Sequence, residues 1–337
     1  MVEEKKRIQW IDLAKGFCIM LVVLQHVSEL TAVDYPLSVQ AFGFRMPLYF
    51  ILSGLFFKQY EGFTGFLKRK TNKLLIPFLF FFFVTAVLPY FILLLPDRIN
   101  LFKDIFTLLY DKDLIMFNSP IWFLLCLFEV NILFYIVQWL ARKISETHKT
   151  ALVLVLSCLI GFTGLMLGVK GLNIVFYIDT AMSVLPFFAF GWWLFRHTHI
   201  LTSPVNYIRD LIIVIICAVI LYYTAVPVKW VVNRITIENT TTVYISGIAG
   251  TIMVLMLAKV IGRLPVISYL GRYSIMVLCT HCLFVQVMVK FLGQHLSGMS
   301  FLLVVFIASL MASFLLIPFM KRFMPHVTAQ KDVIKVP

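Results

Sequence analysis

Charged residues are scarce in this chain of 337 residues. Asp, Glu, Lys and Arg together make up 13% of it, while 61% is hydrophobic. A soluble domain has about 25% charged residues, because water must solvate its surface. The shortage therefore excludes an ordinary soluble enzyme, a disordered chain and a coiled coil. Long apolar runs are present instead, and they predict an all-α polytopic membrane protein.

Paired cysteines are also missing. Each of the six Cys residues lies inside an apolar run, and no CxxC motif is matched by a second one. This pattern excludes a disulfide-stapled secreted domain and provides no zinc framework. Cys279 and Cys282 flank His281, which leaves a metal site open as an alternative, but thiols in apolar helices are usually packing residues. We expect no metal.

Ten segments are long enough to cross a bilayer, whose core of about 30 Å needs about 20 helical residues. They are 10–30, 37–57, 74–95, 119–140, 150–169, 172–195, 207–226, 241–261, 270–292 and 299–320. We expect the first to be a retained span, because Asp12 and Lys15 interrupt its start and it exceeds signal-peptide length. Residues 97–118 predict a loop with an amphipathic or re-entrant helix. We expect residues 1–337 to form a single integral-membrane domain.

Basic residues outnumber acidic ones, 29 against 16, and their distribution predicts the orientation of the chain. With the N-terminus inside, 20 of the 29 fall in inside segments and seven in outside loops. This asymmetry follows the positive-inside rule and predicts that both termini are cytoplasmic. The basic excess is then an orientation signal that also attracts membrane lipid, and it requires no nucleic acid. Lys15 and Arg45 lie within spans and need another explanation.

Seven ionisable side chains fall inside the expected spans, where a charge is costly and usually faces a bundle interior or a wet cavity. They are Asp12, Lys15, His26, Arg45, Glu129, Asp179 and His281. Each is a candidate for function. Each also has a structural alternative, which is an internal ion pair or a satisfied core position.

The first span carries Asp12, Lys15 and His26. Asp12 and Lys15 are three residues apart, and Lys15 and His26 are eleven apart, so these pairs share a helix face. A rise of about 1.5 Å per residue separates Lys15 from His26 by about 16 Å. A ligand that touches both must run along the membrane normal. The alternative is a boundary ion pair between Asp12 and Lys15, with His26 as an interior histidine.

The second expected span contains Arg45 and Pro47. Proline removes a backbone donor and disturbs the helix. Irregular backbone at membrane depth must be buried in protein or wetted, so this segment is a candidate cavity wall. A cavity bounded by His26 and Arg45 would hold a base and a cation that binds anions. The alternative is close helix packing at Ser53 and Gly54.

Six motifs, in order along nearly the whole chain, resemble those of the acyltransferase family 3 integral-membrane proteins. This family includes O-acetyltransferases of bacterial surface polysaccharides. The matching stretches are IDLAKGFCIMLVVLQH (11–26), FRMPLYFILSG (44–54), KRKTNKLLIPF (68–78), SPIWFL (119–124), LPFFAFGWWL (185–194) and YLGRYSIMVLCTHCL (269–283). Lys15 is a departure, because the family usually has arginine there; lysine keeps the charge but loses the bidentate fork.

The resemblance implies transfer of an acyl group, usually acetyl, from a cytoplasmic acyl-CoA such as acetyl-CoA. The implied acceptor is a hydroxyl of an envelope glycan or glycolipid at a bacterial inner membrane. His26 is the expected general base, because histidine accepts protons near neutral pH. Arg45 is the candidate to stabilise the oxyanion. Lys15 is better placed to hold the donor.

Further residues follow from the same resemblance. Coenzyme A carries several phosphate charges, for which the cationic candidates are Lys68, Arg69, Lys70 and Lys73; the alternative is topology charge alone. The expected substrate cavity is lined by Asp12, Trp122, Glu129, Asp179 and His281. The alternatives are core packing for Trp122 and internal ion pairs for Glu129 and Asp179.

Two other function classes stay open. A transporter or flippase would use the same polar cavity to move a glycan or a lipid-linked substrate. Inverted repeats or paired broken helices would favour transport, and we find neither in the sequence. A non-catalytic subunit of an envelope complex is the third class.

Overall fold

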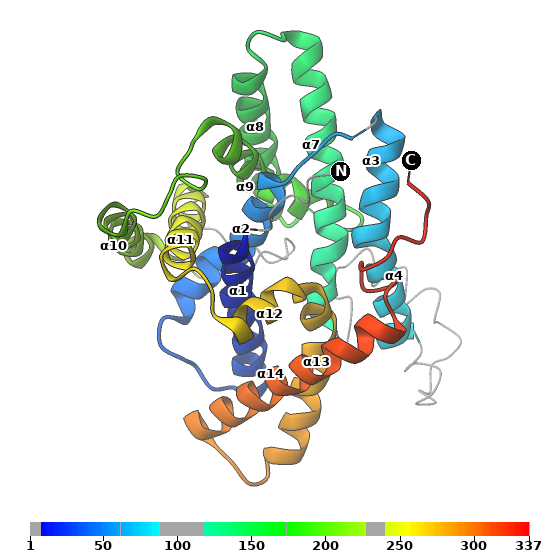
Figure 1. Cartoon of the computed structure of the whole chain (residues 1–337), viewed down its shortest axis with the longest axis vertical. Helices are drawn as coiled ribbons and strands as arrows, with labels where there is room; N and C mark the ends of the chain where they lie inside the picture. Colours follow the sequence, from blue (N-terminus) through cyan, green and yellow to red (C-terminus); the bar gives the residue numbers. More distant parts are fainter. Residues whose placement is uncertain (1–7, 61, 88–117, 173, 227–239, 337) are drawn as a thin grey trace.

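The computed structural model describes residues 8–60, 62–87, 118–172, 174–226 and 240–336, and every regular element in these ranges is helical (Figure 1). The helices are α1 (Gln9–Thr31), α2 (Ser38–Leu55), α3 (Gly62–Lys70), α4 (Ile76–Phe82), α7 (Trp122–Ile144), α8 (Lys149–Val169), α9 (Ile178–His197), α10 (Tyr207–Thr224), α11 (Thr240–Ile261), α12 (Pro265–Arg272), α13 (Ser274–Leu292) and α14 (Gly298–Phe323). Two π-helical segments, η1 (Thr71–Leu75) and η2 (Phe83–Val87), and a 3₁₀ turn, η4 (Ser119–Ile121), complete them. The expected all-α class is confirmed.

Eight of the described helices are long and apolar enough to cross a membrane. They are α1, α7 with η4, α8, α9, α10, α11, α13 and α14. The chain is a polytopic membrane protein. The second expected span, 37–57, is helical as α2, but it is not among the eight, because Arg45 and Pro47 lower its mean hydropathy.

The third expected span, 74–95, is part of a longer helical run. That run begins at Gly62, passes through α3, η1, α4 and η2, and is described as far as Val87. Residues 88–95, and 97–117 of the expected loop, lie outside the described residues. Helix α3 was not predicted, because it is short and strongly basic rather than apolar.

The sixth expected span, 172–195, begins later in the structure, at Ile178. Gly171 and Phe176 adopt positive φ angles of 65° and 60°, a conformation that interrupts an α-helix. Asp179 then accepts hydrogen bonds from the backbone N–H groups of Thr180 and Ile174, at 2.7 and 3.1 Å. The bond from Thr180 satisfies a donor that the start of a helix leaves unpaired, and the bond from Ile174 holds the preceding segment against α9.

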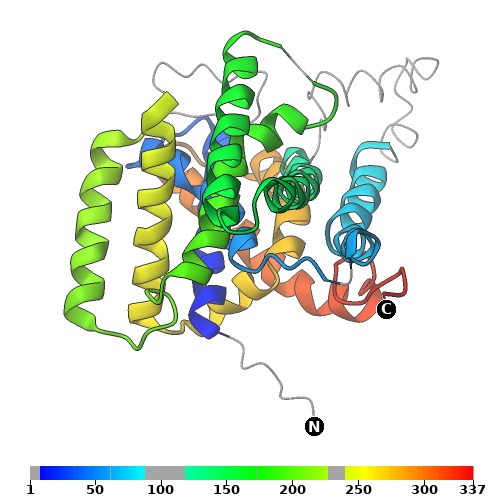
Figure 2. The ribbon, with the colours of Figure 1, turned by 90° about the horizontal axis from the view of Figure 1, so that it is seen from above.

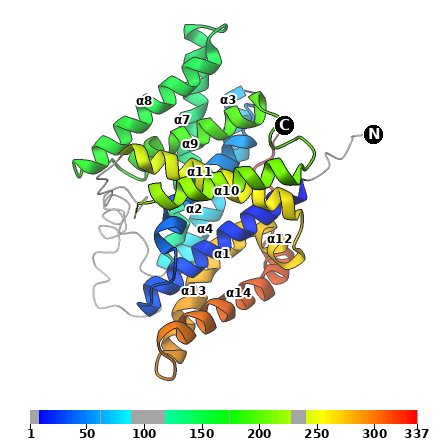
Figure 3. The same ribbon diagram turned by 90° about the vertical axis from the view of Figure 1, so that its left-hand side faces the viewer.

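Helices α1, α2 and α9 lie in the interior of the bundle, with α1 between the α10–α11 pair and α14 (Figure 3). Glycines let their backbones approach closely. A side chain at Gly54 of α2 would collide with the carbonyl of Phe188, and one at Gly191 of α9 would collide with that of Ile51. Gly271 places α12 against the start of α1 in the same way.

Helix α10 lies at the edge of the molecule beside α11 (Figure 2). Most of its length is exposed and apolar, as a lipid-facing helix requires. Its first turn is fixed to α11 by a buried ion pair between Asp210 and Lys259, at 3.5 Å. Lys259 also donates to the carbonyl of Ile200 at 2.7 Å. This buried pair therefore holds the start of α10 against α11.

Candidate active site

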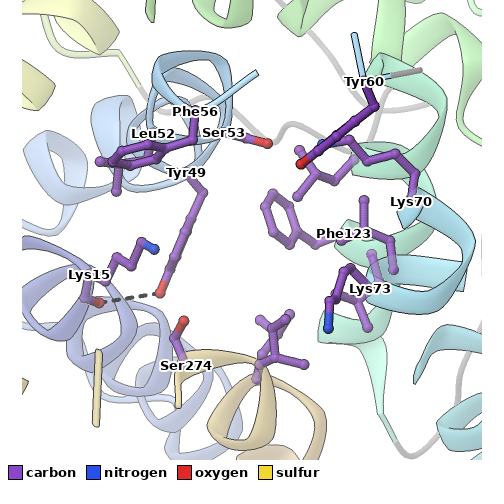
Figure 4. Close-up of a pocket in the computed structure, with 15 residues that line it drawn as sticks. Lys15, Tyr49, Leu52, Ser53, Phe56, Tyr60, Lys70, Lys73, Phe123 and Ser274 are labelled. Atoms are coloured by element: carbon purple, nitrogen blue, oxygen red, sulfur yellow. Dashed lines mark hydrogen bonds between the residues drawn. The ribbon is translucent and has the colours of Figure 1, made fainter. Parts of the chain in front are cut away.

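A cavity of about 400 Å³ lies beside the first half of α1 (Figure 4). Its walls come from α1, α2, α7, α13 and the junction of α3 with η1. Three of its lining side chains are lysines, Lys15, Lys70 and Lys73, and most of the others are apolar or aromatic. Ammonium groups at the edge of an apolar wall suit an anionic ligand that also has an apolar portion.

The lysines approach the cavity from opposite sides (Figure 4). Lys15 belongs to α1, and Tyr49 of α2 donates its hydroxyl hydrogen to the Lys15 carbonyl oxygen at 3.3 Å. Lys70 and Lys73 belong to the helical run that precedes the expected span 74–95. Burial lowers the pKa of the Lys70 ammonium to about 8, so its charge is sensitive to mildly alkaline pH.

A π-helical segment, η1, follows Lys70 and carries Lys73. Pro77 lacks the N–H that an α-helix would donate to the carbonyl of Lys73, and the π segment η1 precedes it. Lys70 and Lys73 line the cavity, whereas Lys68 and Arg69 lie outside the lining. The structure thus brings two members of the predicted phosphate-binding set together with Lys15.

Arg69 still lies close to the cavity, because its guanidinium stacks over the ring of Tyr60 at 4.5 Å, and Tyr60 is a lining residue. Aromatic stacking of this kind holds an arginine in a fixed place. Arg69 therefore supports the cavity wall.

The C-terminal segment reaches the same junction. Lys73 Nζ lies 2.9 Å from a carboxylate oxygen of Asp332 and donates to the carbonyl of Ala329 at 2.9 Å. The neighbouring Asn72 donates to the carbonyl of Ile334 at 2.8 Å and accepts its N–H at 2.9 Å. The tail therefore holds one of the three cavity lysines.

A second polar cluster lies toward the other end of α1. The rings of His26 and His281 are 5.3 Å apart between centroids, with an angle of 45° between their planes. His26 Nδ1 lies 3.3 Å from a carboxylate oxygen of Glu29, one turn further along α1. The other oxygen of Glu29 accepts from the Gln25 side chain at 3.0 Å. A histidine held by a carboxylate at Nδ1 presents Nε2 as a proton acceptor.

His281 is fully buried on α13. Its Nδ1 lies 2.8 Å from the carbonyl oxygen of Val277, and a carbonyl only accepts, so Nδ1 carries the hydrogen. In the neutral ring Nε2 is then an acceptor, and within the described residues this atom has no hydrogen-bond partner. A buried acceptor without a partner is unusual and marks a place for a ligand's donor group.

Arg45 lies on α2 and is only 9% exposed. Its guanidinium stacks over the ring of Phe42 at 4.1 Å, and the thiol of Cys18 donates to its carbonyl oxygen at 2.9 Å. Glu29 and Tyr35 are near enough to interact electrostatically with the guanidinium. Arg45 therefore shares the neighbour Glu29 with His26.

The cavity and the histidine pair are joined along α13. Ser274 and Leu278 line the cavity, and His281 follows Leu278 by one helical turn. On α1, Lys15 lines the cavity and His26 lies about three turns further on. Two helices thus lead from the lysines to the histidines.

Trp122 and Glu129 of the predicted substrate cavity lie on α7 and meet at Tyr177. The rings of Trp122 and Tyr177 are 5.5 Å apart, and Glu129 accepts the backbone N–H of Tyr177 at 3.5 Å. Both residues thus contact the segment that leads into α9.

Asp12 and Asp179 occupy the first turns of α1 and α9, and both are buried. Asp179 accepts backbone N–H groups there, as described above. Of the predicted cavity set, His281 contacts His26 through its ring.

Glu29 and Tyr35 were missed in the sequence. Glu29 follows His26 by three residues on the same helix, and this spacing could have identified it as the partner carboxylate. No such spacing was available for Tyr35, because it lies in the connection between α1 and α2 and reaches Gln25 only through the fold, at 3.1 Å.

A family model described as an acyltransferase domain matches residues 8–318. The chain belongs to acyltransferase family 3. It is therefore a membrane acyltransferase, which needs an acyl donor and an acceptor. The comparisons with curated proteins and with solved structures gave no match. The lysine cavity and the histidine pair lie inside the matched residues.

Proposed function

We propose that this acyltransferase moves an acyl group, acetyl in the first instance, from a cytoplasmic acyl-CoA to a hydroxyl of an envelope glycan or glycolipid. The whole chain acts as one unit in a bacterial inner membrane, with both termini in the cytoplasm. The observation that carries the proposal is the histidine pair of His26 and His281, with Glu29 beside it. Helices α1 and α13 lead from this pair to the lysine-lined cavity.

The donor binds in the cavity near Lys15. Its phosphate groups interact with Lys70, Lys73 and Lys15, which act as point charges. The apolar wall accommodates the thioester arm, which extends past Tyr49 and Leu278 toward the histidines. The positive-inside distribution supports entry of the donor from the cytoplasm.

The acceptor hydroxyl binds at the histidine pair. The carboxylate of Glu29 is 47% exposed, so this cluster opens toward the end of α1 that is remote from Lys15. His26 Nε2 removes the hydroxyl proton, and the oxygen attacks the thioester carbonyl, forming a C–O bond and an oxyanion. Arg45 stabilises the oxyanion. Collapse of the oxyanion breaks the C–S bond, and His26 gives the proton to the leaving coenzyme A thiolate.

Glu29 and His281 position these groups. The Glu29 carboxylate fixes the ring of His26 and stabilises the imidazolium that forms when it takes the proton. His281 presents an unprotonated Nε2 from α13 and accepts a hydrogen bond from the acceptor substrate.

Substitution of His26 tests this function. We expect His26→Ala to lose about 10²- to 10⁴-fold in acyl transfer, the usual contribution of a general base. The measurement is acyl-CoA-dependent acylation of glycans in membranes, followed by mass spectrometry. The control is His295→Ala, which removes an exposed histidine after α13.

Retention of acyl transfer by the His26→Ala protein would contradict the proposal. Continued movement of a glycan or lipid-linked substrate by that variant, with no acyl transfer in the parent protein, would favour a transporter instead.

A further inference from the structure

A second polar pocket, of about 240 Å³, lies between α7, α8, α9 and the segment that follows α2. It is lined by Gln59, Gln138, Lys149, Trp192 and Arg196. Lys149 begins α8, and Arg196 and Gln138 lie near the ends of α9 and α7. Among the described residues, its lining shares no member with the lysine cavity. The proposed function gives this pocket no role.

The acceptor atoms of the pocket are used by the protein itself. The side-chain oxygen of Gln138 accepts from the Gln59 amide at 3.5 Å. The side-chain oxygen of Gln59 in turn accepts from Arg142 at 2.8 Å. These bonds orient the Gln138 amide so that its NH₂ group, and not its oxygen, is left over for a ligand.

Two of the donor groups on this pocket belong to buried side chains. Gln138 is 2% exposed and Trp192 is 5% exposed. Gln138 Nε2 and Trp192 Nε1 have no hydrogen-bond partner in the described part of the chain. Buried donors are nearly always paired, so two of them on one pocket indicate a ligand that accepts hydrogen bonds.

The charge of the pocket is positive. Arg196 stacks over the Trp192 ring at 5.2 Å and donates to the carbonyl of Phe57 at 3.4 Å. That single bond leaves most of its five N–H groups available. Lys149 adds an ammonium group, whose carboxylate neighbour Glu146 is 3.8 Å away on the exposed rim.

We propose that this pocket binds a phosphate group, supplied either by the headgroup of an anionic phospholipid or by free phosphate. A phosphate offers several acceptor oxygens and negative charge, which match a lining of an amide NH₂, an indole N–H, a guanidinium and an ammonium. The position at the ends of three membrane-spanning helices is where lipid headgroups lie. A bound phosphate links α7, α8 and α9.

The test uses the full chain purified in detergent. One arm measures retention of phosphatidylglycerol, against zwitterionic phosphatidylcholine, by native mass spectrometry. The other arm measures the shift in unfolding temperature on addition of inorganic phosphate at constant ionic strength. The variants are Arg196→Gln and the nearly isosteric Gln138→Glu, which replaces a donor with an acceptor. The control is Lys143→Gln, because Lys143 is an exposed cation on α7 outside the lining.

We expect the parent and Lys143→Gln proteins to bind at least about tenfold more tightly than either pocket variant. Retention of phosphatidylglycerol without a response to inorganic phosphate identifies the lipid as the source; the reverse identifies free phosphate. Equal binding by the parent and by both pocket variants, or no binding of either ligand by the parent, overturns the proposal. If the Arg196→Gln protein does not fold, the comparison of the Gln138→Glu protein with the parent tests the proposal.

Discussion

The two ends of α1 carry polar groups of different kinds. Near Lys15, three ammonium groups line a cavity from two sides, with Lys15 on α1 facing Lys70 and Lys73 of the α3–η1 run. Near His26, the polar groups are held by hydrogen bonds to neighbours such as Glu29. Phosphate recognition requires charge at the right place, whereas proton transfer requires a fixed ring direction. Substitutions near His26 should therefore change kcat, and substitutions near Lys15 should change the donor KM.

Among the changes that compare the two ends of α1, the largest effect is expected for Glu29→Gln. The amide keeps the size of the side chain but removes the charge that stabilises the His26 imidazolium. We expect kcat to fall about 10²-fold with little change in the donor KM. The measurement is the rate of acyl transfer at saturating acyl-CoA in membranes.

Asp34→Asn is the matched control for this change, because Asp34 is an exposed carboxylate in the connection that follows α1. An equal loss of kcat in both variants would show that general negative charge, and not the His26 contact, is responsible.

The second-largest effect is expected for Lys70→Gln, in the cavity near the Lys15 end of α1. Removal of a cavity ammonium weakens donor binding, and we expect the donor KM to rise about tenfold while kcat stays within about twofold. Lys68→Gln is the control, since Lys68 lies on the same helix outside the cavity lining. A fall in kcat without a change in KM would place Lys70 in the chemical step instead.

The third prediction concerns pH. The pKa of Lys70 is lowered to about 8, so its ammonium is charged below that pH and neutral above it. The donor KM of the parent protein should therefore rise as pH increases through about 8. Lys70→Arg should lack this rise, because arginine stays charged. A rise of the same size in both proteins would assign the dependence to another group.

The smallest effect is expected for Asp332→Asn. This change releases Lys73 from its ion pair with the C-terminal tail. Exposed ion pairs are worth about 0–1 kcal/mol, so we expect the donor KM to fall by no more than about fivefold. Glu146→Gln removes an exposed carboxylate elsewhere and should leave the donor KM unchanged. A rise in the donor KM of the Asp332→Asn protein would show that the tail assists binding.

Much of the fold could be predicted from the sequence, because length and apolarity alone determine which helices can span a membrane. Eight expected spans correspond to long apolar helices. The start of the sixth span was not predicted, because a positive φ is rare for an aromatic residue such as Phe176 and leaves no sequence pattern. Helix α3 was missed because its basic residues do not produce an apolar run.

The histidine end of the site was easier to predict than the lysine end. His26 and His281 both lie in motifs, and the structure places their rings 5.3 Å apart. Lys68 and Lys70 lie two residues apart on the same helix, α3, which places them on different sides of it. The sequence did not show which of these sides faces the cavity.

The most direct test of the division between the two ends is a double-mutant cycle with Glu29→Gln and Lys70→Gln. The quantities measured are kcat and the donor KM for the parent, both single variants and the double variant. Distant sites that act independently add within about 0.5 kcal/mol, so the double variant should combine the kcat of one with the KM of the other. A double variant whose kcat differs from that of Glu29→Gln, or whose donor KM differs from that of Lys70→Gln, by clearly more than this margin would contradict the account.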